Sequence, residues 1–216
     1  MKSVLIYGDS LVYGKIPKVS NRYEHHKTFV GVIEKNLGTE FRVISEGLRA
    51  RTLDGENGFF SKRNGLEQFG PILGSHLPLD VVIIFLGVND CNRMDTKDDS
   101  AIYGSLLKYK QEVIDWCKNL SVDKIPKILV VAPPHIRAEQ LVIDEPMSKI
   151  FGPDAEGKSK RLTEIYNDFC SREDCEFFDA SLYCKTSDGE GVHLDEENNF
   201  LLGQALTEKI RNVITI

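Results

Sequence analysis

Four residues spread along this sequence carry groups that are useful in catalysis, namely Ser10, Gly47, Asn89 and His193. A serine hydroxyl becomes an effective nucleophile when a base accepts its proton, and an imidazole, with an unperturbed pKa of about 6.5, suits that task. Each residue alone has a commoner explanation. Serine, glycine and asparagine often form turns or helix caps, and a lone histidine is usually a surface residue. The elements that position these residues therefore decide between catalysis and ordinary structure.

Five short apolar segments predict β-strands, and helical spacing of apolar residues predicts the helices between them. The predicted strands are residues 4–7, 41–44, 81–86, 128–131 and 177–178. The third is apolar throughout, as expected of a central parallel strand that helices cover on both faces. The predicted helices are residues 28–37, a helix carrying Leu106 to Cys117, residues 160–169, and a C-terminal helix carrying Leu201 to Ile210.

Two long segments lack such periodicity. Residues 46–79 are rich in glycine, arginine and asparagine and predict mostly loops and short turns, and residues 135–157 also predict irregular structure. Within the first segment, Arg49 and Arg51 are expected to be solvated at the surface. Contact with substrate or with another subunit is the alternative for both arginines.

The alternation of strands and helices predicts a parallel sheet between layers of helices, in one α/β domain spanning residues 1–216. Reactive groups gather at the carboxyl ends of the strands in such sheets. Ser10, Gly47 and Asn89 follow the first three predicted strands, and His193 follows the last. We therefore expect these four groups to meet at one edge of the sheet.

The composition, with 41% hydrophobic and 28% charged residues, is typical of a soluble globular protein. A net charge of -6 without a long lysine or arginine cluster argues against a nucleic acid partner, because binding a polyanion needs a basic face. The amino-terminal apolar run is too short for a signal peptide, and no apolar run is long enough to span a membrane. We therefore expect a cytoplasmic protein that does not enter membranes.

The five cysteines are irregularly spaced and include no Cys-x-x-Cys pair. This pattern predicts reduced thiols and no zinc site. The spacing of His25, His26 and His76 does not suggest a metal site either, so no metal is expected.

Four motifs resemble, in order, the sequence blocks of the GDSL or SGNH hydrolase family. They are Gly-Asp-Ser-Leu (residues 8–11), Glu-Gly-Leu (46–48), Gly-Val-Asn-Asp (87–90) and Gly-Val-His-Leu (191–194). Residues 46–52, 76–80 and 197–199 are similar to the bacterial arylesterase/acyltransferase branch of that family. Because the blocks span nearly the whole chain, the sequence is identified as a member of the family.

The resemblance implies the SGNH hydrolase fold, a flavodoxin-like, doubly wound parallel sheet in a three-layer α/β/α sandwich. It also implies a serine esterase without cofactor, in which Ser10 is the nucleophile and His193 the general base of a Ser–His–acid triad. The backbone N–H groups of Ser10 and Gly47 and the amide of Asn89 would form the oxyanion hole, where one donor typically contributes about 3 kcal/mol. The expected substrates are small acyl esters, foremost acetyl esters.

The acid of the triad has two candidates. The family usually places an aspartate three residues before the histidine, and here that position holds Glu190. Glutamate reaches farther from the backbone and serves in the triads of some α/β-hydrolases. Asp188, five residues before His193, is the alternative acid, and a backbone carbonyl that orients the imidazole is the third alternative. We favour Glu190.

Other interpretations remain open at this point. His135 lies just past the fourth predicted strand and is a candidate pocket residue. Acyl transfer to an alcohol shares the acyl-enzyme with hydrolysis. A flavodoxin-like binding module is disfavoured because the sequence lacks a glycine-rich nucleotide-binding loop. A degenerate hydrolase that serves as an interaction protein has only the departure at Glu190 in its favour, and self-association into a homo-oligomer is a further alternative.

Overall fold

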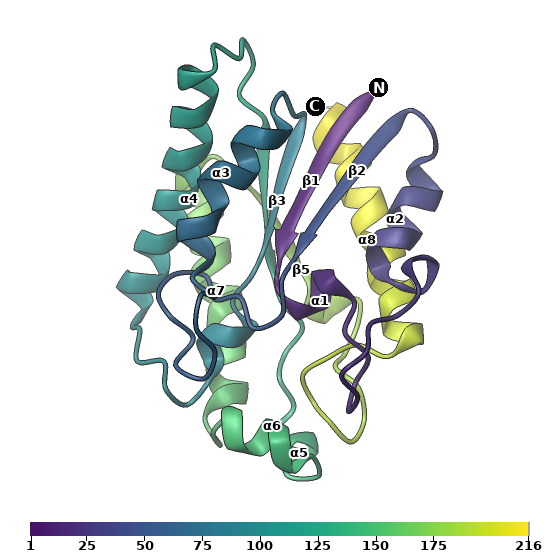
Figure 1. Ribbon diagram of the computed structural model, residues 1–216, viewed down its shortest axis with the longest axis vertical. Helices are drawn as coiled ribbons and strands as arrows, with labels where there is room; N and C mark the ends of the chain where they lie inside the picture. Colours follow the sequence, from purple (N-terminus) through teal and green to yellow (C-terminus); the bar gives the residue numbers. More distant parts are fainter. Residues whose placement is uncertain (216) are drawn as a thin grey trace.

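Five strands form one parallel sheet in the order β2-β1-β3-β4-β5 (Figure 1). The computed structural model describes residues 1–215, and its strands are β1 (Lys2–Gly8), β2 (Phe41–Gly47), β3 (Val81–Phe85), β4 (Lys127–Ala132) and β5 (Glu176–Asp179). Leu5 of β1 pairs with Ile44 on one side and Val82 on the other. Strand β3 is buried along its whole length, as its apolar sequence predicts. The five predicted strands are thus confirmed to within a few residues.

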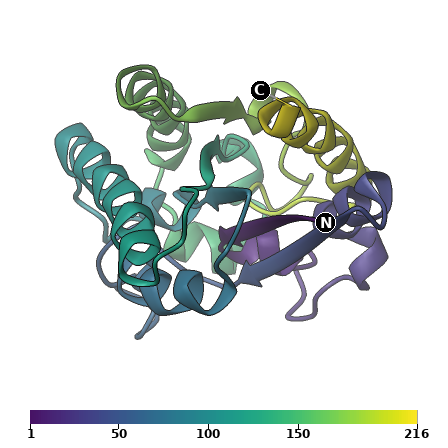
Figure 2. The ribbon, with the colours of Figure 1, turned by 90° about the horizontal axis from the view of Figure 1, so that it is seen from above.

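Helices cover both faces of this sheet, which gives the predicted three-layer sandwich (Figure 2). On one face, α2 (Phe29–Leu37) packs against α8 (Glu196–Thr215). On the other face, α4 (Asp99–Asn119) contacts both α3 (Gly65–His76) and α7 (Ala155–Glu173). The chain runs from β1 outward to β2 and then returns to β3 on the other side of β1, so the sheet is doubly wound.

Helix α3 lies in a segment where the sequence predicts loops, and that prediction is wrong. The segment contains Pro71 and several glycines, which weaken a helical pattern. Two of these glycines face α4. A Cβ atom at Gly70 would lie 2.5 Å from Nε1 of Trp116, and one at Gly74 would lie 2.4 Å from its Cζ3. The glycines therefore permit close packing of α3 on α4, at a cost in helix propensity.

Two short helices, α5 (Ala138–Leu141) and α6 (Glu145–Ile150), lie beyond the carboxyl ends of the strands (Figure 1). The sequence predicts irregular structure here, because helices of 4 and 6 residues are too short to show apolar periodicity. The Asp144 carboxylate caps α6 by accepting a hydrogen bond from the backbone N–H of Met147 at 3.2 Å. These helices stand over the edge of the sheet where the candidate catalytic groups are expected.

Within residues 1–215, no helix combines the length and apolar character that crossing a membrane requires. The same residues contain no group of three or more histidine, cysteine, aspartate or glutamate side chains arranged to hold a metal ion. All five cysteines are free thiols, and only Cys175 is partly exposed.

Candidate active site

Ser10 is the first residue of α1 (Ser10–Tyr13), which begins directly after β1. The Asp9 carboxylate caps this helix by accepting a hydrogen bond from the Leu11 N–H at 2.9 Å. Gly14 ends it in the left-handed conformation, with φ of 79°. This short helix fixes the Ser10 hydroxyl at the carboxyl edge of the sheet, where it is 4% exposed.

His193 reaches Ser10 from the loop that precedes α8. Its Nε2 lies 3.0 Å from the Ser10 Oγ, although the two residues are 183 positions apart in the chain. Backbone hydrogen bonds shape the loop: the Ser187 N–H donates to the His193 carbonyl at 2.7 Å, and the Gly191 N–H donates to the Ser187 carbonyl at 3.0 Å. Gly191 has φ of 81°, and a Cβ there would lie 2.6 Å from the Arg137 carbonyl oxygen.

The structure places only one of the two candidate acids beside the imidazole. Glu190 is fully buried, its Oε1 lies 2.5 Å from Nδ1 of His193, and its Oε2 accepts the His193 backbone N–H at 2.8 Å. Asp188 instead points outward, with 74% of its side chain exposed, and its Oδ1 lies 2.6 Å from Nη1 of Arg137. The hydroxyl, imidazole and carboxylate of Ser10, His193 and Glu190 therefore form one continuous chain of contacts.

Lys15 is a member of this site that sequence reasoning missed. Its Nζ lies 3.3 Å from Oε1 of Glu190 and donates to the Ile16 carbonyl at 3.2 Å. The lysine side chain is only 8% exposed. A single lysine in a polar loop gives no spacing signal, so its pairing with a residue 175 positions away follows only from the fold.

The surroundings shift the pKa values of Glu190 and His193, the two titrating groups of the candidate triad. Burial raises the pKa of Glu190, but the hydrogen bonds and charge of His193, together with Lys15, outweigh burial and lower it to about 2. Burial lowers the pKa of His193, and the charges of Lys15 and Arg49 lower it further against the opposing effect of Glu190. At neutral pH the site therefore holds an ionised Glu190 and a neutral His193.

Asn89 lies in the 3-10 turn Val88–Cys91 that follows β3. Its Nδ2 donates to the Arg51 carbonyl at 3.0 Å and reaches Oδ2 of Asp9 at 3.4 Å. Because both partners are acceptors, they define which end of the amide carries the N–H groups. One N–H is well bonded, and the other has only the long contact with Asp9.

Gly47 ends β2 and pairs with Gly8 at the end of β1. A Cβ at this position would lie 2.2 Å from the Tyr13 backbone nitrogen, so α1 leaves no room for a side chain. The close approach of α1 therefore explains a glycine here without any strained φ angle. The predicted residues from the first, second, third and last strands thus lie at the same edge of the sheet.

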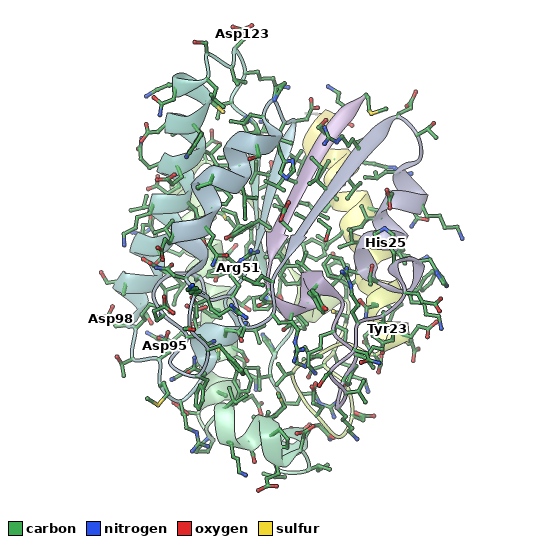
Figure 3. The ribbon with its side chains drawn as sticks, in the orientation of Figure 1. Tyr23, His25, Arg51, Asp95, Asp98 and Asp123 are labelled. Atoms are coloured by element: carbon green, nitrogen blue, oxygen red, sulfur yellow. The ribbon has the colours of Figure 1, made fainter. Side chains whose placement is uncertain are left out.

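Arg51 links the ends of the first two strands and is buried, so its predicted surface position is wrong. Its Nη1 donates to the Gly8 carbonyl at 2.8 Å and also to the Glu46 carbonyl. The guanidinium lies over the Tyr7 ring, 4.1 Å from its centroid, beside the carboxyl ends of β1 and β2 (Figure 3). Arg51 therefore supports the loop whose carbonyl holds Asn89.

A cavity of about 270 Å³ opens beside the candidate catalytic groups and is lined by Ser10, Asn89 and His193. One part of its wall is apolar and includes Phe60, Met147, Ile150 and Phe151. Another part is cationic and includes Lys15, Arg49 and Arg63. His135 does not line this cavity. Its imidazole is directed toward α7, with Nε2 3.4 Å from Oγ1 of Thr163, so the structure contradicts its placement in the pocket.

The family model described as GDSL-like lipase/acylhydrolase matches residues 6–200, which is most of the chain. The chain belongs to this family. It is a carboxylic ester hydrolase, and the resemblance drawn from its motifs is confirmed. The search of curated proteins gave no match.

Several solved structures share the SGNH hydrolase fold over the full length of this GDSL-like chain. Est24, a carbohydrate acetylesterase from Sinorhizobium meliloti, is 32% identical with a TM-score of 0.90, and the match covers 99% of this chain and 100% of that chain. The M. smegmatis aryl esterase gives the same identity, coverage and TM-score. A carbohydrate acetylesterase family member from Sinorhizobium meliloti is 30% identical with a TM-score of 0.91, covering 100% of both chains.

Proposed function

We propose that this esterase hydrolyses small acyl esters through an acyl-enzyme formed on Ser10. The observation that carries the proposal is the chain of contacts from the Ser10 hydroxyl through His193 to Glu190, at 3.0 and 2.5 Å, beside an open cavity. Nucleophile, base and orienting acid lie within hydrogen-bond reach of one another, which is the geometry that serine hydrolysis needs. Loss of p-nitrophenyl acetate hydrolysis in Ser10→Ala is the direct test.

The protonation states define the first step. An ionised Glu190 accepts the Nδ1–H of His193, which leaves the Nε2 lone pair facing the Ser10 hydroxyl. His193 takes the hydroxyl proton while Ser10 attacks the ester carbonyl, and Glu190 stabilises the imidazolium that forms. His193 then gives this proton to the departing alcohol, and a water molecule activated in the same way releases the acid from Ser10.

The tetrahedral intermediate carries negative charge on the former carbonyl oxygen. We assign its stabilisation to the backbone N–H groups of Ser10 and Gly47 and to the Asn89 amide. Nδ2 of Asn89 has a good hydrogen bond to the Arg51 carbonyl and only a long 3.4 Å contact with Asp9, which leaves donor capacity for the oxyanion. The pKa of Asp9 is raised to about 7, chiefly by burial. The hydrogen bond from the Leu11 N–H opposes this rise, and the charge of the nearby Asp90 adds to it.

Asn89→Ala should lower kcat by roughly a hundredfold or more and change KM little, because an oxyanion donor acts mainly in the transition state. Steady-state kinetics with p-nitrophenyl acetate measure both constants. Asn57→Ala removes an amide from the same cavity wall and is the matched control, with a much smaller expected change in kcat. An unchanged kcat with a raised KM in Asn89→Ala would assign Asn89 to substrate binding instead.

Lys15→Met should move the acid limb of the kcat/KM profile to higher pH. The reaction needs neutral His193, so the rate falls as the pH drops through the pKa of this residue. Burial and then the charges of Lys15 and Arg49 lower that pKa below its ordinary value, so removing the lysine charge raises it again. Lys15→Arg keeps the charge and should keep the limb where the wild type has it. A limb that stays in place in Lys15→Met would remove Lys15 from the electrostatics of the site.

The size of the cavity favours small substrates. At about 270 Å³ it lies below the range of roughly 300–1,000 Å³ that is usual for ligand pockets. Together with the carbohydrate acetylesterase and aryl esterase among the similar structures, this supports acetyl esters as the preferred class. Acyl transfer is the second candidate, because the cavity has an apolar wall formed by Phe60, Met147 and Phe151, and apolar surroundings favour an alcohol over water as the acceptor. Partition of the acyl-enzyme between water and an added alcohol separates the two activities.

A further inference from the structure

The catalytic cavity differs in charge from the protein as a whole. The chain has 33 acidic and 27 basic residues, so its net charge is -6. The cavity wall nevertheless includes Lys15, Arg49 and Arg63, and no acidic side chain from the described residues, 1–215, lines it. Lys15 has an acidic partner in Glu190, with Oε1 3.3 Å from Nζ. The positive charges left facing the cavity are those of the two arginines.

Neither arginine has an acidic partner among residues 1–215. Nη1 of Arg49 donates to the Ser20 carbonyl at 3.2 Å. Nε of Arg63 donates to the Arg49 carbonyl at 2.8 Å, and its Nη1 donates to the carbonyls of Ser61 and Lys62. A guanidinium has five N–H donors, so several donors on each side chain have no protein acceptor in the described structure. By contrast, Arg137 in the neighbouring loop pairs with both Glu139 and Asp188.

The positive charge of Arg49 acts on His193. Arg49 is near enough to His193 that its charge helps to lower the pKa of the imidazole. A charge placed at the mouth of a partly enclosed cavity acts more strongly than one on an open surface, because protein rather than water surrounds it. Because Arg49 and Ser10 line the same cavity of about 270 Å³, one small molecule in this cavity can contact both residues.

We infer that the esterase takes small esters bearing a carboxylate, which Arg49 and Arg63 hold while the ester carbonyl meets Ser10. The guanidinium fork matches a carboxylate with paired N–H groups, and the pair would supply the acceptors that both side chains lack. A phosphate would use the same donors, but the small volume of the cavity favours the smaller carboxylate. This inference rests on the proposed function and specifies its substrate class.

Two matched substrate pairs test the inference and locate the charge. 4-Acetoxybenzoate and its methyl ester differ by a charge on the alcohol part, and mono-p-nitrophenyl glutarate and its methyl ester differ by a charge on the acyl part. The measured quantity is the ratio of kcat/KM for the charged ester to that for the neutral ester, from release of the phenol. Assay at pH 8 keeps His193 neutral in every variant, so its altered pKa does not contribute.

The double variant with Arg49→Gln and Arg63→Gln should lower this ratio by about tenfold or more for at least one pair, because a hydrogen bond to a charged group is worth roughly 1.5–3 kcal/mol. The change should lie mainly in KM for the charged ester. Arg49→Gln alone removes a single backbone hydrogen bond and should lower the ratio in the same direction without disturbing the fold. Arg42→Gln, exposed at the amino end of β2, is the control for net charge and should leave the ratio unchanged.

The outcomes separate this inference from the proposed function. The carboxylate site is wrong, and the esterase mechanism stands, if the wild type hydrolyses the neutral esters, Ser10→Ala does not, and both Arg49→Gln and the double variant keep the wild-type ratio. If Ser10→Ala keeps the activity, the mechanism is wrong and the inference falls with it. An equal drop in the ratio for Arg42→Gln would show an effect of overall charge and would also overturn the carboxylate site.

Discussion

Replacing Ser10 with alanine should reduce ester hydrolysis by about a millionfold, the scale seen when a triad nucleophile is removed from a serine hydrolase. The reason is local. The Ser10 hydroxyl makes one hydrogen bond, to Nε2 of His193, and alanine keeps the helix-forming backbone at the start of α1. We therefore expect loss of the acyl-enzyme with little loss of stability.

Stopped-flow and steady-state assays with p-nitrophenyl acetate measure the rate, and thermal unfolding checks the fold. Ser187→Ala is the matched control, because Ser187 is a buried serine of the same region whose hydroxyl has no hydrogen-bond partner. That variant should retain activity near the wild-type level. Turnover above a trace in purified Ser10→Ala, or an equal loss in Ser187→Ala, would remove Ser10 from the role of nucleophile.

Glu190→Gln should lower kcat by roughly a thousandfold to ten-thousandfold, whereas Asp188→Asn should leave it near the wild-type value. The amide keeps the size of the side chain but replaces an acceptor with a donor beside Nδ1 of His193. It thus favours the tautomer whose Nε2 carries the proton and cannot accept another from Ser10. The exposed Asp188 contacts Arg137 rather than the imidazole, so its change should affect only that surface pair.

Both variants are assayed across pH with the same acetyl ester, after circular dichroism confirms equal folding. The order of the two rates is the prediction. Crippled activity in Asp188→Asn with normal activity in Glu190→Gln would reverse the assignment of the acid. Normal activity in both variants would leave His193 and Ser10 as a dyad without a carboxylate.

The sequence predicts the sheet better than it predicts the helices that pack on it. Strands such as β3 are continuous apolar runs, because helices cover both of their faces, and this pattern is local and easy to read. Helix α3 is missed because it contains Gly70 and Gly74, which weaken its helical pattern. These glycines make room for Trp116, a residue distant in the chain. A glycine that a tertiary contact requires lowers the helix propensity of its own segment, so the helix cannot be recognised from that segment alone.

The same distinction holds at the site. Ser10, Gly47, Asn89 and His193 could be placed together because each follows a strand of one parallel sheet, and Glu190 could be favoured over Asp188 by its register with His193. The sequence could not place Lys15, Arg51 and Arg63 at the site, since their positions depend on contacts with distant segments or on burial. The tip of a long, flexible side chain is the part of a structure that local sequence determines least.

The separation of Ser10 and His193 along the chain has a consequence for how activity arises during synthesis. A ribosome makes Ser10 well before His193, which lies 183 positions later in the chain. A nascent chain can contain all five strands and the serine at the sheet edge while the loop before α8 is still missing. Such a chain has no group to take the hydroxyl proton. Under the proposed mechanism, hydrolysis needs this loop to bring His193 to Ser10, so a nascent chain that ends before the loop should be inactive.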